Sequence, residues 1–388
     1  MSKKKTILVL HFSGRMPVAG VGWEGMNWVL GLRKLGHDVW YVEDNGVNPY
    51  SFQQNSVHWD SAENIGFVKA MMERYGLGDR WAYWDPVTEY SWHGVSKERA
   101  MRLYKEADAI VNLCGATKLR EEHMACPVRI LIDTDPIYEQ IKLAKGDADS
   151  IAYVDAHTHL FTIGENLGAP DCPVPLGSRV WNKVRPPINL DVWPADLESS
   201  PKAFSSLATW QHSSKNIDFE GESYQWSKHM NFTRFLDLPK RTAQPLDLAL
   251  RPPTPEVDKI VRGNGWNLID PVPVSNGLGV YQDFLYRSRG ELSVAKDIYV
   301  RPRSGWFSDR SVCYLAAGRP VITQDTAFGK YIPTGEGLFA FSTHEEALDA
   351  IERINKDYKR HQKAARGIAE DYFEASKQMK RVCDAAGF

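Results

Sequence analysis

Basic and small residues between positions 296 and 325 could bind an anion. Ser308 is a good N-cap residue, Asp309 suits a first helical turn, and Gly318 suits the left-handed position just past a helix. The start of such a helix presents free backbone N–H groups at the positive end of the helix dipole, where a phosphate or diphosphate can bind. Arginines, which hold phosphate oxygens through two hydrogen bonds, gather nearby at Arg301, Arg303 and Arg310. The pattern predicts a nucleotide-type ligand, and a capped helix with solvated arginines is the alternative.

Three residues in the first half of the chain could transfer a proton: Glu24, Asp135 and His157. A carboxylate or an imidazole can take the proton of an attacking hydroxyl group. Each residue also has a structural interpretation. Glu24 could be a helix acid favoured by the dipole, Asp135 part of an Asp-Pro turn, and His157 a surface or cleft histidine.

Two short motifs could hold a metal ion, Asp133-Thr-Asp135 and His157-Thr-His159. Paired carboxylates suit Mg²⁺ or Mn²⁺, whereas a catalytic zinc ion needs three protein ligands and no third ligand follows in the sequence. We therefore expect no metal. Asp133, His159 and Glu165, which lie at or near predicted strand ends, are expected to contact a second substrate instead.

The segment Gly20-Val-Gly22-Trp-Glu-Gly25 fits the dinucleotide pattern G-x-G-x-x-G, and Glu43 ends the next predicted strand. Seven residues separate Phe12, the end of the first strand, from the first glycine. A true dinucleotide motif turns almost directly from strand to helix. A flexible glycine loop at a cleft edge, with Gly22 and Trp23 near a substrate, is the preferred interpretation.

These residues need a scaffold, and strands that alternate with helices predict a parallel, doubly wound sheet. The prolines between 167 and 194 predict a linker, after which a second alternating series begins. Expected strands cover 6–12, 38–43, 109–113, 128–132, 160–163, 204–209, 247–250, 266–269, 297–301 and 320–323. Expected helices cover a segment around 26–35, then 98–106, 227–237, 255–263, 279–288, 309–317, 344–356 and 357–384.

The bulk composition is that of a globular protein of two domains. The chain has 388 residues, 43% of them hydrophobic, and a net charge of −2, so no general surface for polyanions is expected. The five cysteines are scattered, which argues against a disulfide framework. The apolar run 6–12 after the basic start is too short for a signal peptide or a membrane span, so we expect a cytoplasmic protein.

The chain resembles the GT-B glycosyltransferases, in particular the bacterial "family 1" and spore-maturation-type group. The resemblance rests on the segment 32–39, Leu-Arg-Lys-Leu-Gly-His-Asp-Val, and on the segment 314–322, Tyr-Leu-Ala-Ala-Gly-Arg-Pro-Val-Ile. It implies two facing Rossmann-like domains: an acceptor domain at 1–188, a donor domain at 189–365, and a closing helix at 366–388 that returns to the first domain.

The resemblance also implies roles for residues on the donor side. The diphosphate would lie on the segment 304–310, the loop at Asp325 and Thr326 would reach the sugar, and Trp210 and Lys215 occupy the spacing of a basic pair of which only the lysine is kept. Many retaining relatives carry a ribose-binding glutamate where this chain has Cys313. The remaining expected donor residues are Lys296, Tyr299, Arg301, Arg303, Ser304, Gly305, Trp306, Ser308, Asp309 and Arg310.

The expected function is metal-independent transfer of a sugar from a nucleotide-diphosphate donor to an acceptor hydroxyl, with no cofactor besides that co-substrate. The acceptor could be a natural product, a glycan, a protein or modified phage DNA. A nucleotide-sugar epimerase of the same fold and a non-catalytic binding relative are the alternatives.

Overall fold

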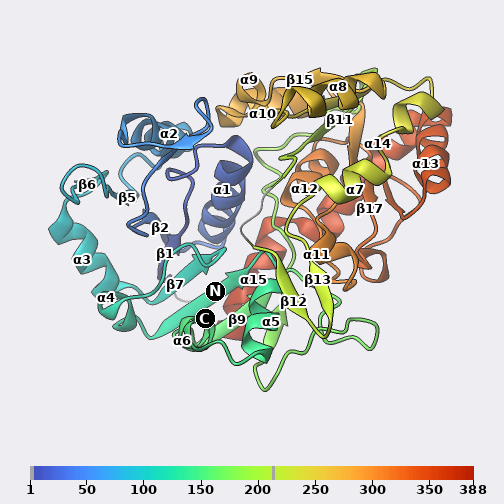
Figure 1. Ribbon diagram of the computed structural model, residues 1–388. Helices are drawn as coiled ribbons and strands as arrows, with labels where there is room; N and C mark the ends of the chain where they lie inside the picture. Colours follow the sequence, from blue (N-terminus) through green and yellow to red (C-terminus); the bar gives the residue numbers. More distant parts are fainter. Residues whose placement is uncertain (1–3, 212–214) are drawn as a thin grey trace.

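The computed structural model describes residues 4–211 and 215–388; residues 1–3, part of the basic start of the chain, lie outside the described residues. Two sheets surrounded by helices make up the molecule (Figure 1). The first sheet has the strand order β10-β9-β8-β7-β1-β2-β5-β6, and only the pair β5–β6 is antiparallel. Its strands are β1 (Thr6–Leu10), β2 (Asp38–Glu43), β5 (Trp81–Trp84), β6 (Trp92–His93), β7 (Ala109–Leu113), β8 (Val128–Asp133), β9 (His159–Thr162) and β10 (Trp181–Lys183).

Apolar runs place the central strands of this sheet in the core. Ile7 to Leu10 and all of β7 are buried, as expected for strands that are covered on both faces. The surrounding elements are α1 (Ala19–Lys34), the hairpin β3 (Tyr50–Ser51) and β4 (Ser56–Val57), α2 (Ala62–Arg74), α3 (Lys97–Glu106), α4 (Glu121–Met124), α5 (Tyr138–Ala144) and α6 (Ala148–Asp155).

The predicted glycine loop at residues 20–25 is wrong, because this segment is helical. Helix α1 already begins at Ala19, so Glu24 lies in its second turn. A Cβ atom on Gly25 would come within 2.8 Å of the His11 ring, so the glycine lets α1 approach the end of β1 closely. The glycines therefore serve helix packing rather than loop flexibility.

The second sheet is parallel throughout, with the strand order β15-β14-β11-β16-β17-β18. Its strands are β11 (Phe204–Leu207), β14 (Leu246–Ala249), β15 (Asn267–Ile269), β16 (Gly290–Ser293), β17 (Val321–Gln324) and β18 (Leu338–Phe341). Around it lie the hairpin β12 (Ile217–Phe219) and β13 (Glu222–Tyr224), α7 (His229–Arg234), η1 (Leu238–Arg241), α8 (Pro255–Gly263), α9 (Pro271–Ser275), α10 (Leu278–Tyr286), α11 (Asp297–Val300), α12 (Asp309–Ala316), η2 (Phe328–Lys330) and α13 (His344–Lys356).

The predicted strand at 297–301 is wrong, since that segment is the short helix α11. The real strand, β16, carries Gly290, Glu291 and Ser293, which are poor strand formers. A Cβ atom on Gly290 would come within 2.3 Å of the Pro320 carbonyl oxygen, so close packing requires glycine there. Glu291 is fully buried and needs a cationic partner, which tertiary structure supplies.

The C-terminal helices return to the first unit. The expected single helix at 357–384 is instead α14 (Tyr358–Ile368), the π-helical turn η3 (Ala369–Phe373) and α15 (Ala375–Ala386). A bridge between Ile188 and Glu374 marks the break, and α15 packs against α1 where Gly31 faces Met379. The predicted boundary at 188–189 falls between the two sheets and stays a prediction.

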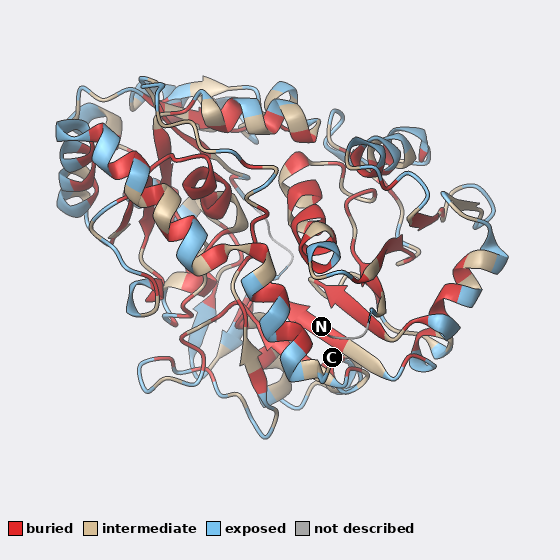
Figure 2. Cartoon of the chain, turned by 180° about the vertical axis from the view of Figure 1, so that it is seen from behind, coloured by how far each residue is buried: buried red, intermediate tan, exposed pale blue. Residues whose placement is uncertain are grey.

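Burial is concentrated in both sheets and on the helix faces turned toward them (Figure 2). The two units also contact each other directly through α1 and α10. Among the described residues, no helix combines the length and the apolar composition needed to traverse a lipid bilayer.

Candidate active site

Glu24 lies at the carboxyl end of the first sheet, beside residues that follow two neighbouring strands. Its Oε2 is 3.5 Å from His11 Nε2, and its Oε1 accepts a hydrogen bond of 3.1 Å from the Cys114 thiol. Burial raises the pKa of Glu24 to about 7, and the charge of Asp135 adds to this effect although the Cys114 hydrogen bond opposes it. A carboxyl group with this pKa can exchange a proton near neutral pH.

Asp135 links the two units. Its carboxylate pairs with Lys296 Nζ at 3.2 Å and accepts a hydrogen bond from the Tyr299 hydroxyl. Burial disfavours its charge, but Lys296 and Tyr299 outweigh that cost and hold the pKa of Asp135 below its usual range. Asp135 is therefore the ionised member of the site, and Glu24 is the one that titrates.

Aromatic rings surround the Asp135–Lys296 pair. Trp306 stacks on Tyr299 with the ring centroids 4.5 Å apart and donates its indole N–H to the Thr134 carbonyl oxygen at 3.2 Å. Lys296 Nζ lies 3.8 Å from the Trp226 ring centroid. These contacts fix the ammonium group on the boundary between the units.

The start of α12 brings a third carboxyl group to the same place. Burial raises the pKa of Asp309 well above its usual value, and the neighbouring charge of Glu24 raises it further. The Ser308 side chain makes no capping hydrogen bond, so no N-cap side chain satisfies the first turn of this helix. The predicted helix start is thus present, close to the acid–base residues of the other unit.

Lys228 is a functional candidate that sequence reasoning missed. Burial pushes its pKa well below the usual value, and the charges of Arg310 and Lys296 lower it further. Arg310 is tied to the buried Glu291 at 2.6 Å and to Ser293 Oγ at 2.8 Å. Arg310 is paired with Glu291 and Lys296 with Asp135, so Lys228 is a third basic group beside these two pairs. An anionic ligand would relieve this crowding of basic groups, and perturbed groups of this kind are candidates for a functional site. The signal in the sequence is weak, because Lys228 only precedes a helix of six residues.

The amides next to Gly305 are not free for a ligand. Gly305 N–H donates to the Thr326 carbonyl oxygen at 2.6 Å, and Trp306 N–H donates to Ser304 Oγ at 3.2 Å. A Cβ atom on Gly305, whose φ is +74°, would come within 2.4 Å of the Asn166 amide nitrogen. The expectation that the segment 304–310 offers free amides to a diphosphate is therefore wrong at residues 305 and 306, whose amides are paired.

The structure directs two of the three expected arginines away from the helix start. Arg301 pairs with Asp297 at 2.9 Å and with Glu222 at 2.7 Å. Arg303 pairs with Asp171 at 2.8 Å. Arg301 directly follows α11, and both arginines are exposed. Only Arg310 of the three remains near α12.

Several expected site residues have structural contacts instead. His157 is buried with Nε2 on Asn112 at 3.0 Å, and burial lowers its pKa to about 4. His159 begins β9 and so lies at the strand end opposite the cleft. Glu165 forms a two-point ion pair with Arg185 at 2.8 and 2.9 Å.

The remaining corrections concern packing residues. Gly22 and Trp23 face α10, where the Trp23 indole donates to the Leu278 carbonyl oxygen at 3.1 Å. Trp210 is a core residue that stacks on Phe232. Thr326 Oγ1 donates to the Trp306 carbonyl oxygen at 2.6 Å and so ties its loop to the segment before α12. Asp325 accepts the Ala327 N–H at 2.8 Å and shapes its own loop.

A cavity of about 360 Å³ adjoins Asp135 on the side of the first unit. Asp133, one of its lining residues, is buried, which raises its pKa to about 7 despite hydrogen bonds from Gln140 and Thr162. Within the described residues, the buried polar atoms Glu139 Oε2, Ser150 Oγ and Trp181 Nε1, from side chains that line this cavity, have no hydrogen-bond partner. The other lining residues are Cys114, Gly115, Lys118, Leu131, Tyr138, Lys142, Asp149, Tyr153, Lys215 and Trp226.

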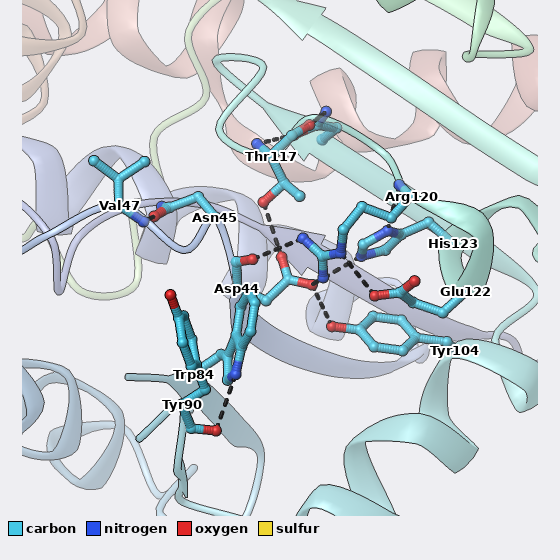
Figure 3. Close-up of polar contacts among 11 residues, drawn as sticks. Asp44, Asn45, Val47, Trp84, Tyr90, Tyr104, Thr117, Arg120, Glu122 and His123 are labelled. Atoms are coloured by element: carbon cyan, nitrogen blue, oxygen red, sulfur yellow. Dashed lines mark hydrogen bonds and ion pairs between the residues drawn. The ribbon is translucent and has the colours of Figure 1, made fainter. Parts of the chain in front are cut away.

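A buried polar network holds the loop that follows β7 (Figure 3). The same loop carries Cys114, Gly115 and Lys118, which line the cavity. Asp44 accepts hydrogen bonds from Tyr104 at 2.6 Å, Thr117 at 2.9 Å, Arg120 at 2.7 Å and His123 at 2.8 Å. Burial alone would raise the pKa of Asp44, but the His123 contact and the other partners lower it far below its usual range. This saturated network has a positioning role and leaves no group for substrate.

Solved structures share this architecture. An alpha-glucosyltransferase in complex with UDP and a 13-mer DNA matches over 99% of this chain and 100% of its own, with a TM-score of 0.62 and 11% identity. The fold is GT-B. A glycosyltransferase of avilamycin A biosynthesis (TM-score 0.53, 13% identity, 98% and 97% coverage) has the GT-B architecture of this chain as well. So does Anabaena HepE in complex with UDP and glucose (TM-score 0.51, 10% identity, 98% and 99% coverage). No protein-family model and no curated protein matches the chain by sequence.

Proposed function

We propose that the protein transfers a sugar from a nucleotide-diphosphate donor to an acceptor hydroxyl group at the boundary between its two units. The observation that carries the proposal is the crowding of Lys228, Lys296 and Arg310 near the start of α12, across from Glu24 and Asp135. The GT-B structures in complex with UDP or UDP-glucose support the same activity.

The donor diphosphate would bind at the first turn of α12, with Lys228 and Lys296 beside it. Negative charge builds on the departing nucleoside diphosphate as the bond between the sugar and the phosphate oxygen breaks. Fixed cations and a helix N-terminus can stabilise that charge without a metal ion, so metal-independent transfer is part of the proposal. Arg310, already paired with Glu291, would contribute both to the shape of the site and to its field.

Glu24 is the best candidate for the general base. Its raised pKa of about 7 lets it accept the acceptor hydroxyl proton near neutral pH. Asp135 stays ionised and would hold Lys296 in place. The new bond forms between the acceptor oxygen and the anomeric carbon as the diphosphate leaves.

The cavity beside Asp135 would hold the acceptor. Aromatic walls and unpartnered polar atoms suit a neutral, hydroxyl-bearing molecule. Three lysines and four carboxyl groups line the cavity. Because the lining is not predominantly basic, it does not favour binding of a polyanion. Natural products and glycans therefore fit better than DNA, although neighbours of this fold are found with DNA.

Incubation with UDP-, GDP-, dTDP- and ADP-sugars tests the proposal. A sugar transferred only when an acceptor from a panel of glycosides and polyphenols is present supports it. An isomerised donor formed without any acceptor would instead indicate an epimerase. Donor binding with no turnover would indicate a binding relative, the alternative favoured by the buried Cys313 at the usual glutamate position.

A further inference from the structure

Three residues far apart in the sequence bring their ligating atoms together at the end of the first sheet. His11 follows β1, Glu24 lies on α1, and Cys114 follows β7. One ligand atom from each lies within 4.8 Å of the others, a spacing that a single metal ion can close with small side-chain shifts. Among the described residues, this is the group of three that has such a spacing.

The imidazole of His11 is oriented as a metal ligand would be. Its Nδ1 is 2.8 Å from Ser13 Oγ, which fixes the ring, while Nε2 points toward Glu24. His11 is fully buried, and Nε2 has no hydrogen-bond partner in the part of the chain that the structure describes. A ring nitrogen without a hydrogen-bond partner, on a ring that a contact at the other nitrogen holds in place, is typical of metal-binding histidines.

Cys114 and Glu24 complete the set from the other side. Thr134 Oγ1 lies 3.0 Å from Cys114 Sγ, an outer contact of the kind that orients a ligating sulfur atom. Cys114 also lines the cavity of about 360 Å³, which gives an ion a route from solvent. Zinc prefers ligands such as one thiolate, one imidazole and one carboxylate. Magnesium and calcium require oxygen ligands, so this set does not suit them.

We propose that His11, Glu24 and Cys114 form a binding site for a zinc-like transition-metal ion, with water in the fourth position. Binding breaks the hydrogen bond between Cys114 and Glu24 and releases the thiol proton, with any proton on Glu24, to solvent. The bonds formed are those from the ion to sulfur, nitrogen and carboxylate oxygen, with no change in oxidation state.

An occupied site would oppose the transfer reaction. This consequence, unlike the site itself, rests on the proposed function, because a carboxylate that ligates a metal can no longer accept the proton of an acceptor. In the metal-independent reaction proposed above, zinc would therefore act as a reversible inhibitor that occupies the Glu24 carboxylate.

Binding of metal to the full-length, metal-free protein tests the site without any assay of activity. Titration with Co²⁺ should give the intense near-ultraviolet absorption of a cobalt–thiolate bond, and calorimetry with Zn²⁺ should show one site per chain. Cys114→Ser should abolish the cobalt band and weaken Zn²⁺ binding about 100-fold, since a soft ligand is lost. A wild-type protein without the band, or Cys114→Ser with unchanged Zn²⁺ affinity, overturns the proposal.

The chain offers a matched control. Cys383 Sγ also lies near a histidine, 3.8 Å from His37 Nε2, but these two belong to no three-ligand group among the described residues. Cys383→Ser should therefore keep the cobalt band and the Zn²⁺ affinity. If Cys383→Ser lost the cobalt band and the Zn²⁺ affinity, the metal would bind at Cys383 and His37, and the assignment would be overturned.

A measurement on the wild-type protein avoids any folding defect. Zn²⁺ should slow alkylation of Cys114 by iodoacetamide, read by mass spectrometry, and leave the rates at the other cysteines unchanged. Equal alkylation of Cys114 with and without Zn²⁺ contradicts the site. Binding of UDP, measured on the same samples, reports separately on the proposed function.

Discussion

The boundary between the two units has two regions in which charged side chains have different environments. At the paired edge, defined by Glu165, Asn166, Asp171, Arg185, Arg303 and Lys330, every charged side chain has a partner. In the cleft cluster, defined by Glu24, Asp135, Lys228, Lys296, Asp309 and Arg310, burial and like charges displace several pKa values.

The difference separates structure from function. Asp171 receives both Arg303 at 2.8 Å and Lys330 at 2.5 Å, and these contacts lower its pKa far below the usual range. Such pairing fixes how the units sit against each other. The cleft cluster contains the pairs Asp135–Lys296 and Arg310–Glu291, but burial still raises the pKa of Glu24 and lowers that of Lys228. Groups with perturbed pKa values of this kind are candidates for functional sites.

The largest expected effect is that of Glu24→Gln in the cleft cluster. Loss of a general base should reduce turnover about 1,000-fold at pH 7.5. Because the pKa of Glu24 is raised to about 7, the base is present above that pH, and wild-type activity should fall as the pH drops below it. A pH–rate profile checks both statements. A variant that keeps the acid limb of the profile would remove Glu24 from the mechanism.

At the paired edge, Glu165→Gln should cost stability and leave ligand binding intact. Arg185 would lose its charged two-point partner in a largely buried position, at a cost of about 2 kcal/mol in the free energy of unfolding, the contribution of a hydrogen bond to a charged group. Urea denaturation measures this cost, and calorimetry with UDP is the control. A large loss of UDP affinity without a loss of stability would reverse the assignment of the two regions.

The smallest expected effect is that of Asp309→Asn. Burial raises the pKa of Asp309 and so favours its neutral form, which the amide resembles, and nucleotide affinity should change less than about threefold. The folded chain holds a proton that the unfolded chain releases, so wild-type stability falls as the pH rises above the ordinary pKa of aspartate. Asp309→Asn should flatten that fall, because the amide does not titrate. An equal slope in both proteins would mean that Asp309 is already ionised.

Much of the fold could be predicted from the sequence. The apolar composition of strands such as Val128–Asp133 predicts them directly. The N-cap residues of α8 and α13 likewise predict where these helices begin. Strand β16 does not, because Glu291 becomes acceptable in a strand only once Arg310 neutralises it. The role of the α1 glycines in packing likewise cannot be predicted from the sequence, because it depends on the close approach of α10 and of the end of β1.

The site could be predicted only in part, for a physical reason. Glu24 and Asp135 lie within recognisable motifs, so a role in proton transfer could be predicted for each. No sequence motif marks His11, Cys114 or Lys228. They join the site only because the ends of β1 and β7 and the start of α7 lie beside the other charged residues. Arg301 and Arg303 matched the expected composition of an anion site, but ion pairs with Asp297 and Asp171 occupy them.

Calorimetry of UDP, GDP, dTDP and ADP with three proteins tests the central claim that the cleft cluster binds a nucleoside diphosphate. The wild-type chain should bind at least one of them, and Lys228→Ala should weaken that affinity about 10- to 100-fold, the value of a hydrogen bond to a charged group. Lys330→Ala removes the same charge from the paired edge and should bind as the wild type does. Equal affinities in all three proteins, or no binding by the wild type, would contradict the account.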